Sequence, residues 1–146
     1  MKNKTGSLIA VLALLVSGLA CNMSTANLSS LKLGKDKDAT QETTAYKAGD
    51  TIYGVATVSN NPGKVTVTMY LTVDEAPGMN KGETVPNSEV KLELNGDGTA
   101  RYNFPTFPTT RGGKFNMVAD MINEAGEKKD SKTASFTVAP GSSAGS

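Results

Sequence analysis

The sequence contains no histidine and no tryptophan, and only one cysteine among its 146 residues. The absence of histidine removes the side chain most often used as a general base and as a metal ligand. A single thiol cannot form a disulfide within the chain, which excludes a disulfide-held scaffold. The charges nearly cancel, with 15 basic and 14 acidic residues, whereas a nucleic-acid-binding protein carries a marked basic excess. The composition predicts one ordinary domain with no cofactor, no metal and no nucleic-acid partner.

The first 20 residues have the pattern of an export signal. Residues 1–7 carry two lysines and no acid, and residues 8–20 form an uncharged apolar run that ends in small side chains. A helix of this run rises about 20 Å, which is short of the roughly 30 Å hydrocarbon core of a membrane. The pattern therefore predicts that residues 1–20 are a signal peptide and are cleaved.

The position of the lone cysteine gives that signal a more specific reading. Cys21 directly follows Leu19 and Ala20 and precedes the polar Asn22. This arrangement resembles the cleavage box of bacterial lipoproteins, which implies that Cys21 becomes the lipid-modified first residue and anchors the protein to a membrane of the bacterial cell envelope, outside the cytoplasm. By analogy with Gram-negative sorting, Asn22 in place of Asp favours the outer membrane. The alternative is an ordinary secretory peptide that leaves Cys21 as a free thiol.

Between residues 28 and 138 the dominant pattern is alternation with a period of two. It is clearest over residues 64–73, where apolar side chains alternate with threonines and one tyrosine, as in a strand with one buried face. Similar stretches predict strands at residues 28–34, 50–58, 88–94, 98–104, 114–122 and 132–138. With turn sequences between them, the pattern predicts a seven-stranded antiparallel β-sandwich over residues 28–138, preceded by a tether (21–27) and followed by a disordered tail (139–146).

Three short motifs support this fold. They are Tyr46-Lys47-Ala48-Gly49-Asp50-Thr51-Ile52-Tyr53, Gly113-Lys114-Phe115, and Ser135-Phe136-Thr137-Val138. Together they resemble the strand starts and the closing strand of bacterial Ig-like and macroglobulin-type domains. The chain lacks the Cys, Trp, Cys set of antibody-type domains, so the resemblance implies the general sandwich and no particular activity.

The acidic clusters are poor candidates for chemistry. Asp36 and Asp38 have the spacing of Ca²⁺ ligands, but lysines interleave them and no bidentate Glu follows, which favours a solvated loop. Residues 95–98 (Asn-Gly-Asp-Gly) are typical of a tight hairpin turn. Asp74 and Glu75 are adjacent and would point to opposite sides of an extended chain. No serine lies in a nucleophile motif, and the sequence therefore predicts a protein that is not an enzyme.

The candidate binding residues are Pro77, Met79 and Phe107, which lie in loops rich in Pro and Gly. Such side chains either anchor a protein partner or fold back over the end of the sandwich. If the strands alternate in direction, the three long connections (35–49, 74–87 and 105–113) share one pole, and the tight turns share the other pole with the tether. The sequence thus predicts a non-enzymatic interaction or structural module that binds at the membrane-distal pole. The alternative is a small-ligand or carbohydrate-binding sandwich, and the oligomeric state stays open.

Overall fold

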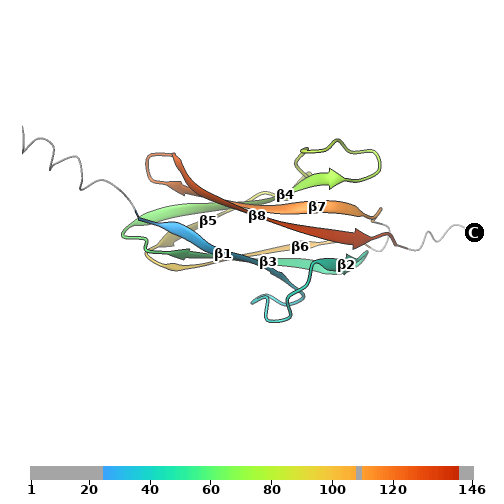
Figure 1. Cartoon of the computed structure of the whole chain (residues 1–146), viewed down its shortest axis with the longest axis horizontal. Helices are drawn as coiled ribbons and strands as arrows, with labels where there is room; N and C mark the ends of the chain where they lie inside the picture. Colours follow the sequence, from blue (N-terminus) through green and yellow to red (C-terminus); the bar gives the residue numbers. More distant parts are fainter. Residues whose placement is uncertain (1–24, 108–109, 142–146) are drawn as a thin grey trace, which may run out of the picture.

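The computed structural model describes residues 25–107 and 110–141, which form eight strands in two packed layers (Figure 1). All seven predicted strands are present, and the predicted all-β, Ig-like sandwich is confirmed. Cys21 and the predicted signal segment lie outside the described residues. The strands are β1 (Asn27–Gly34), β2 (Ala45–Lys47), β3 (Thr51–Ser59), β4 (Lys64–Glu75), β5 (Val90–Asn95), β6 (Gly98–Pro105), β7 (Gly113–Asn123) and β8 (Lys128–Ala139).

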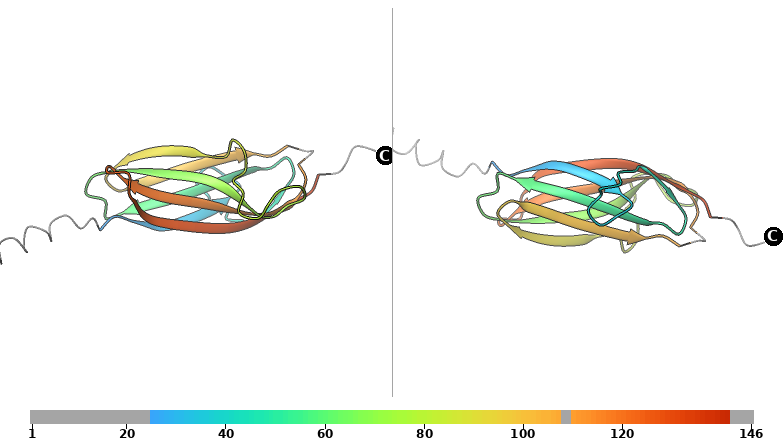
Figure 2. Two further views of the ribbon diagram at one scale, coloured as in Figure 1. Left: turned by 90° about the horizontal axis from the view of Figure 1, so that it is seen from above. Right: turned by 90° about the horizontal axis from the view of Figure 1, so that it is seen from below.

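The strands divide between a small sheet and a large sheet. The small sheet has the order β1-β3-β6, and the large sheet has the order β2-β8-β7-β4-β5. All pairs are antiparallel except β2 with β8, which is parallel. Figure 2 shows that the axes of the long strands in both sheets are nearly aligned with the long axis of the molecule, as in an aligned sandwich.

The strand β2 is the one that the sequence pattern did not predict. It has only three residues, too few to show an alternation, and its ladder to β8 joins segments about ninety residues apart. Tyr46 explains why this short segment is held in place. Its ring is 2% exposed and packs edge-on against Phe136 with centroids 5.6 Å apart, and its hydroxyl donates to the Gly34 carbonyl oxygen at 2.9 Å.

The core lies between the sheets, where alternate side chains of each strand meet. The inward residues of β4 and β7 form its centre, and Met69, Met117 and Met121 are fully buried there. Phe136 is 2% exposed and stacks on Phe115 with centroids 5.8 Å apart. Phe115 is itself partly buried and packs against this cluster.

One of the predicted turns has a different role in the structure. Residues 95–98 form a tight turn with Gly96 at φ 78°, but β5 and β6 belong to different sheets and do not pair. The turn is therefore an inter-sheet corner, and the expected hairpin is wrong. Local sequence specifies the reversal of the chain through its glycines, but which sheet receives the next strand is decided by the packing of both layers.

The sequence predicted that the tight turns lie at one end of the sandwich and the long loops at the other. The structure has this arrangement, with one exception. The tight-turn pole consists of residues 60–63, 95–98 and 123–127, and the described chain begins there, where the Thr25 hydroxyl donates to the Asn60 carbonyl oxygen at 3.2 Å. The long-loop pole consists of residues 48–50, 76–89, 106–107 and 110–112. Residues 35–44 do not reach that pole. They fold against the outer face of the small sheet, where Asp38 pairs with Arg101 of β6 at 2.8 Å (Figure 1).

Among the described residues, no helix has the length and apolar character that a membrane span requires.

Candidate binding site at the long-loop pole

An apolar cavity opens between the two sheets at the long-loop pole. Its volume is about 260 Å³, which is slightly below the range of roughly 300–1,000 Å³ common for small-molecule sites. Its floor is made by side chains of the core, and its walls by the loops that follow β4 and β6. The lining residues are Ile52, Leu71, Ala76, Pro77, Met79, Val85, Phe104, Thr106, Thr110, Arg111, Phe115 and Phe136.

The loop after β4 is fastened along that strand before it reaches β5. The Val85 amide donates to the Leu71 carbonyl oxygen at 2.8 Å, and the Val73 amide donates to Glu83 at 2.9 Å. At the end of the loop, the buried Ser88 hydroxyl accepts from the Leu71 amide at 3.1 Å. Because its backbone is tied in this way, the loop holds Val85 at the cavity wall without filling the space behind it.

The opposite wall is a short turn held by two threonines. The Thr106 hydroxyl donates to the Asp50 carbonyl oxygen at 2.6 Å and accepts from the Gly49 amide at 2.9 Å. The Thr110 hydroxyl oxygen accepts from the Phe107 amide at 2.9 Å. The two Thr106 bonds join this cavity-lining residue to Gly49 and Asp50, directly before β3. The Phe107 side chain beside it is 68% exposed.

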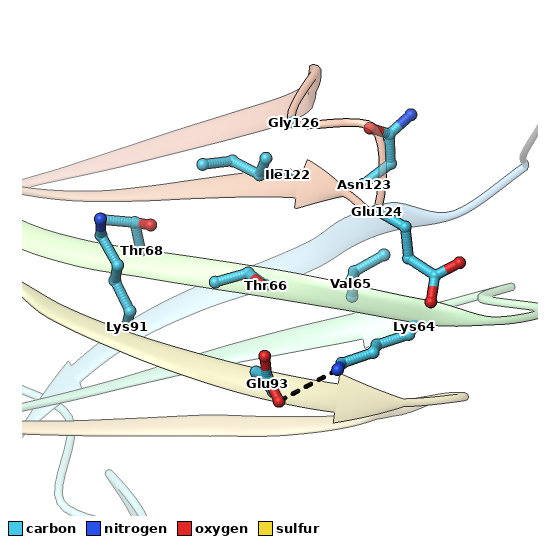
Figure 3. A pocket seen from close by; sticks show the side chains of 10 residues that line it. All are labelled: Lys64, Val65, Thr66, Thr68, Lys91, Glu93, Ile122, Asn123, Glu124 and Gly126. Carbon is cyan, nitrogen blue, oxygen red and sulfur yellow. Dashed lines mark ion pairs between the residues drawn. The ribbon is translucent and has the colours of Figure 1, made fainter.

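A second hollow lies on the outer face of the large sheet, toward the tight-turn pole (Figure 3). Its volume is about 470 Å³, and it is lined by polar and apolar residues of β4, β5 and β7 and of the turn after β7. Lys64 and Glu93 pair across its floor at 3.3 Å. Thr68 is 6% exposed, and its hydroxyl has no hydrogen-bond partner among the described residues. No aromatic ring lines this hollow, so it offers a sugar no stacking surface.

Beside this hollow, Asp120 is the centre of a polar network on the same sheet face. Its carboxylate accepts from Ser131 at 2.6 Å and from Tyr70 at 3.0 Å, and Lys128 lies 3.2 Å away. Burial alone would raise the pKa of Asp120, but these hydrogen bonds together hold that pKa below its ordinary value of 3.8. Burial and the neighbouring carboxylate raise the pKa of Tyr70. The network joins β4, β7 and β8 and therefore has a structural explanation.

The acidic residues considered above as metal ligands or catalytic groups form hydrogen bonds or ion pairs with neighbouring residues. Asp36 accepts hydrogen bonds from the amides of Gln41, Thr40 and Asp38, and these bonds lower its pKa to about 2. Asp74 pairs with Lys81 at 2.8 Å, and Glu75 pairs with Lys114 at 3.4 Å. Within the part of the chain that the structure describes, no three His, Cys, Asp or Glu side chains are grouped to hold a metal.

The comparisons with known proteins add little to this geometry. No protein-family model matches the sequence, and no curated protein matches it either. Among solved structures, the crystal structure of a Niemann-Pick type C2 protein from the Japanese carpenter ant aligns with a TM-score of 0.45 and 17% sequence identity, covering 81% of this chain and 96% of that chain. The cavity is therefore interpreted from its own residues.

Two of the three predicted binding residues line the cavity. Pro77 and Met79 are in its wall, whereas Phe107 projects from the turn beside it. Sequence reasoning missed Val85 and Arg111, which occupy loop positions with no periodicity. The repeated threonines and glycines around Arg111 indicated a loop, but nothing in them indicated that this loop borders a cavity.

Proposed function

We propose that this protein is a non-enzymatic, lipid-anchored Ig-like module that binds an apolar group of its partner or ligand at the long-loop pole. The observation that carries the proposal is the apolar cavity between the sheets, which opens at the pole opposite the beginning of the described chain. Interiors of proteins are ordinarily packed without voids larger than a water molecule. A hollow lined by aliphatic and aromatic side chains at one end of a filled core is a feature typical of a binding site.

The position of the cavity agrees with an anchor at Cys21. Thr25 lies at the tight-turn pole, so a membrane attached four residues earlier would be near that end of the sandwich. The cavity and the exposed Phe107 would then face away from the membrane, where a partner can reach them. Loops on a rigid scaffold are a common location for binding residues.

The lining of the cavity supports a binding role rather than a catalytic one. Its described residues include no carboxylate, no cysteine and no lysine. Its two hydroxyl groups belong to threonines with hydrogen-bond partners: Thr106 bonds to Asp50 and Gly49, and Thr110 accepts from the Phe107 amide. Acid, base and nucleophilic chemistry all require a group that can donate, accept or attack with its partner within reach. This lining provides apolar contact instead.

The test uses the neutral probe 1-octanol and a variant that fills the cavity. In a ¹⁵N–¹H correlation spectrum, 1-octanol should shift the amide signals of Leu71, Val85 and Phe104 in the wild-type domain. Val85→Phe should abolish those shifts. Val90→Phe is the matched control, because Val90 lies on β5 outside the cavity and is 38% exposed, and it should leave them unchanged. Unperturbed signals in the wild type would refute the binding proposal.

The anchor has a separate test in the native host. Wild-type protein should partition with membranes and carry a lipid mass on Cys21, whereas Cys21→Ser should remain an unlipidated precursor. A wild-type mature protein that starts elsewhere without lipid would refute the anchor and leave the cavity proposal intact.

A further inference from the structure

Arg111 is the only charged side chain among the residues that line the cavity. It is exposed, and no hydrogen bond or ion pair joins it to any of the described residues. The other arginine of the chain differs in this respect, because Arg101 pairs with Asp38 at 2.8 Å. The cavity therefore has at its mouth a guanidinium whose donors have no partner in the part of the chain that the structure describes, and a guanidinium favours planar anions such as carboxylates.

The neighbouring residue supplies a second donor. The Thr110 hydroxyl oxygen accepts from the Phe107 amide, and its proton has no acceptor among the described residues. The acids within two residues of the cavity lining have other partners. Asp74 pairs with Lys81 and Glu75 with Lys114, while Glu83 accepts from the Asn80 amide and Asp50 from the Lys47 amide. The mouth of the cavity thus offers two donor side chains, Arg111 and Thr110, next to an apolar interior, and the positive charge of Arg111 has no ion-pair partner among the described residues.

The volume limits the size of the apolar part. A cavity of about 260 Å³ equals about nine times the roughly 30 Å³ that one water molecule occupies in the liquid. Since a carbon or oxygen atom with its hydrogens takes up a similar volume, the interior accepts about eight or nine non-hydrogen atoms. A medium-length alkyl chain or a single substituted ring fits this limit, whereas a polycyclic ligand exceeds it.

We propose that the site selects a small organic carboxylate, whose apolar part enters the cavity while its carboxylate pairs with Arg111 and Thr110. This inference rests on the proposed function, because it names the class of ligand for the same cavity. Arg111 has the role of a specificity-determining residue, and the aliphatic and aromatic lining supplies the contact area. A neutral molecule of the same size would keep the apolar contact and lose the ion pair.

The experiment compares octanoate with 1-octanol, which share the alkyl chain and differ in charge. Binding is measured by the amide shifts of Leu71 and Val85 in the wild type, in Arg111→Gln and in Arg101→Gln. Octanoate should bind the wild type about 10- to 100-fold more tightly than 1-octanol, as expected for hydrogen bonds to a charged group. Arg111→Gln should weaken octanoate binding about 10- to 100-fold more than it changes 1-octanol binding and so remove that advantage. Arg101→Gln, on β6 and outside the cavity lining, should leave the advantage intact.

The outcomes separate the inference from the proposed function. Equal affinity for octanoate and 1-octanol, or an octanoate advantage that survives Arg111→Gln, would overturn the carboxylate inference and leave an apolar binding site. Failure of both probes would overturn both proposals. A third arm tests the source of the carboxylate with N-acetyl-phenylalanine, the mimic of a peptide C-terminus, and its amide. Tighter binding of that acid than of octanoate, with the same dependence on Arg111, would overturn a free small carboxylate in favour of a peptide end.

Discussion

At the tight-turn pole the two inter-sheet turns bond to each other, whereas at the long-loop pole the loop after β4 stands apart from Thr106 and residues 48–50 across a cavity. The Asn61 amide and side chain donate to Asp97 and to the Gly96 carbonyl oxygen, each at 2.8 Å, and the Gly96 amide donates to Gly63 at 2.8 Å. These contacts join the two inter-sheet turns. At the other pole, Val85 is bonded to Leu71 of β4, and Thr106 is bonded to Gly49 and Asp50 just before β3. Among the described residues, no hydrogen bond joins residues 76–87 to residues 106–107 or 110–112.

This difference in hydrogen bonding suits the tight-turn pole to stability and the long-loop pole to binding. Buried hydrogen bonds and close packing at the tight-turn pole stabilise the crossing of the chain between sheets. At the long-loop pole, the loop backbones are fixed but their side chains leave space, so the pole is preorganised without being filled. Preorganisation of this kind lowers the conformational cost of binding. The stability of the domain and its binding capacity should therefore respond to substitutions at different poles.

The largest expected effect is at the floor of the cavity. Phe136→Ala removes a ring that contacts Tyr46 and Phe115 and should lower the free energy of unfolding by about 3–5 kcal/mol. Phe107→Ala removes the same side chain from a site that is 68% exposed and should change stability by less than about 0.5 kcal/mol. Urea denaturation of both variants measures the contrast. Equal effects would mean that the exposed ring is part of the core.

The next prediction tests whether the hydrogen bonds at the tight-turn pole stabilise the fold. Asn61 is 8% exposed, and its side chain donates to Gly96 and accepts from the Gly63 amide. Asn61→Ala should therefore cost about 1–3 kcal/mol, because two backbone groups lose their partners. Asn80→Ala, at an exposed position of the long-loop pole, should be within about 0.5 kcal/mol of the wild type. A neutral Asn61→Ala would remove the proposed difference between the poles.

A smaller, pH-dependent effect on stability is expected for Asp120, which lies on the face of the large sheet between the poles. The folded-state pKa of Asp120 lies below its ordinary value of 3.8, so the ionised carboxylate stabilises the fold above that value and loses this contribution as the pH falls below it. The stability difference between wild type and Asp120→Asn should therefore shrink as the pH is lowered from 5 toward 2. Thermal unfolding across this range provides the measurement, and a constant difference would contradict the prediction.

The sequence predicted the strands because each long strand carries its own alternation, and it predicted the poles because successive strands reverse direction. The position of residues 35–44 could not be predicted from alternation or strand direction. Their length indicated a polar loop, but Ala39, which is 3% exposed, packs beside Gly34, and Asp38 reaches Arg101. Such contacts join positions far apart in the chain, and no local pattern encodes them.

The candidate site was predictable only in part for a related reason. Pro77 and Met79 stand out as apolar or rigid residues in a loop, which is a local signal. Arg111 matters because its partners are absent and because a cavity lies beside it, and both are properties of the assembled loops. An unpaired charge cannot be recognised in a sequence before the contacts of every neighbouring carboxylate are known.

The smallest single effect expected is that of Val85→Leu, and it forms the most direct test of the two poles because the same change, Val→Leu, can be made at both. Val85 borders the cavity and is partly buried, so Val85→Leu adds a methylene to open space and should stabilise the domain by up to about 0.8 kcal/mol. Val58, at the tight-turn end of β3, is 1% exposed in a filled core. Val58→Leu should therefore destabilise by about 1–3 kcal/mol through overpacking. Opposite signs in urea denaturation would establish that one pole is hollow and the other full, and destabilisation by both would show that the cavity closes in solution.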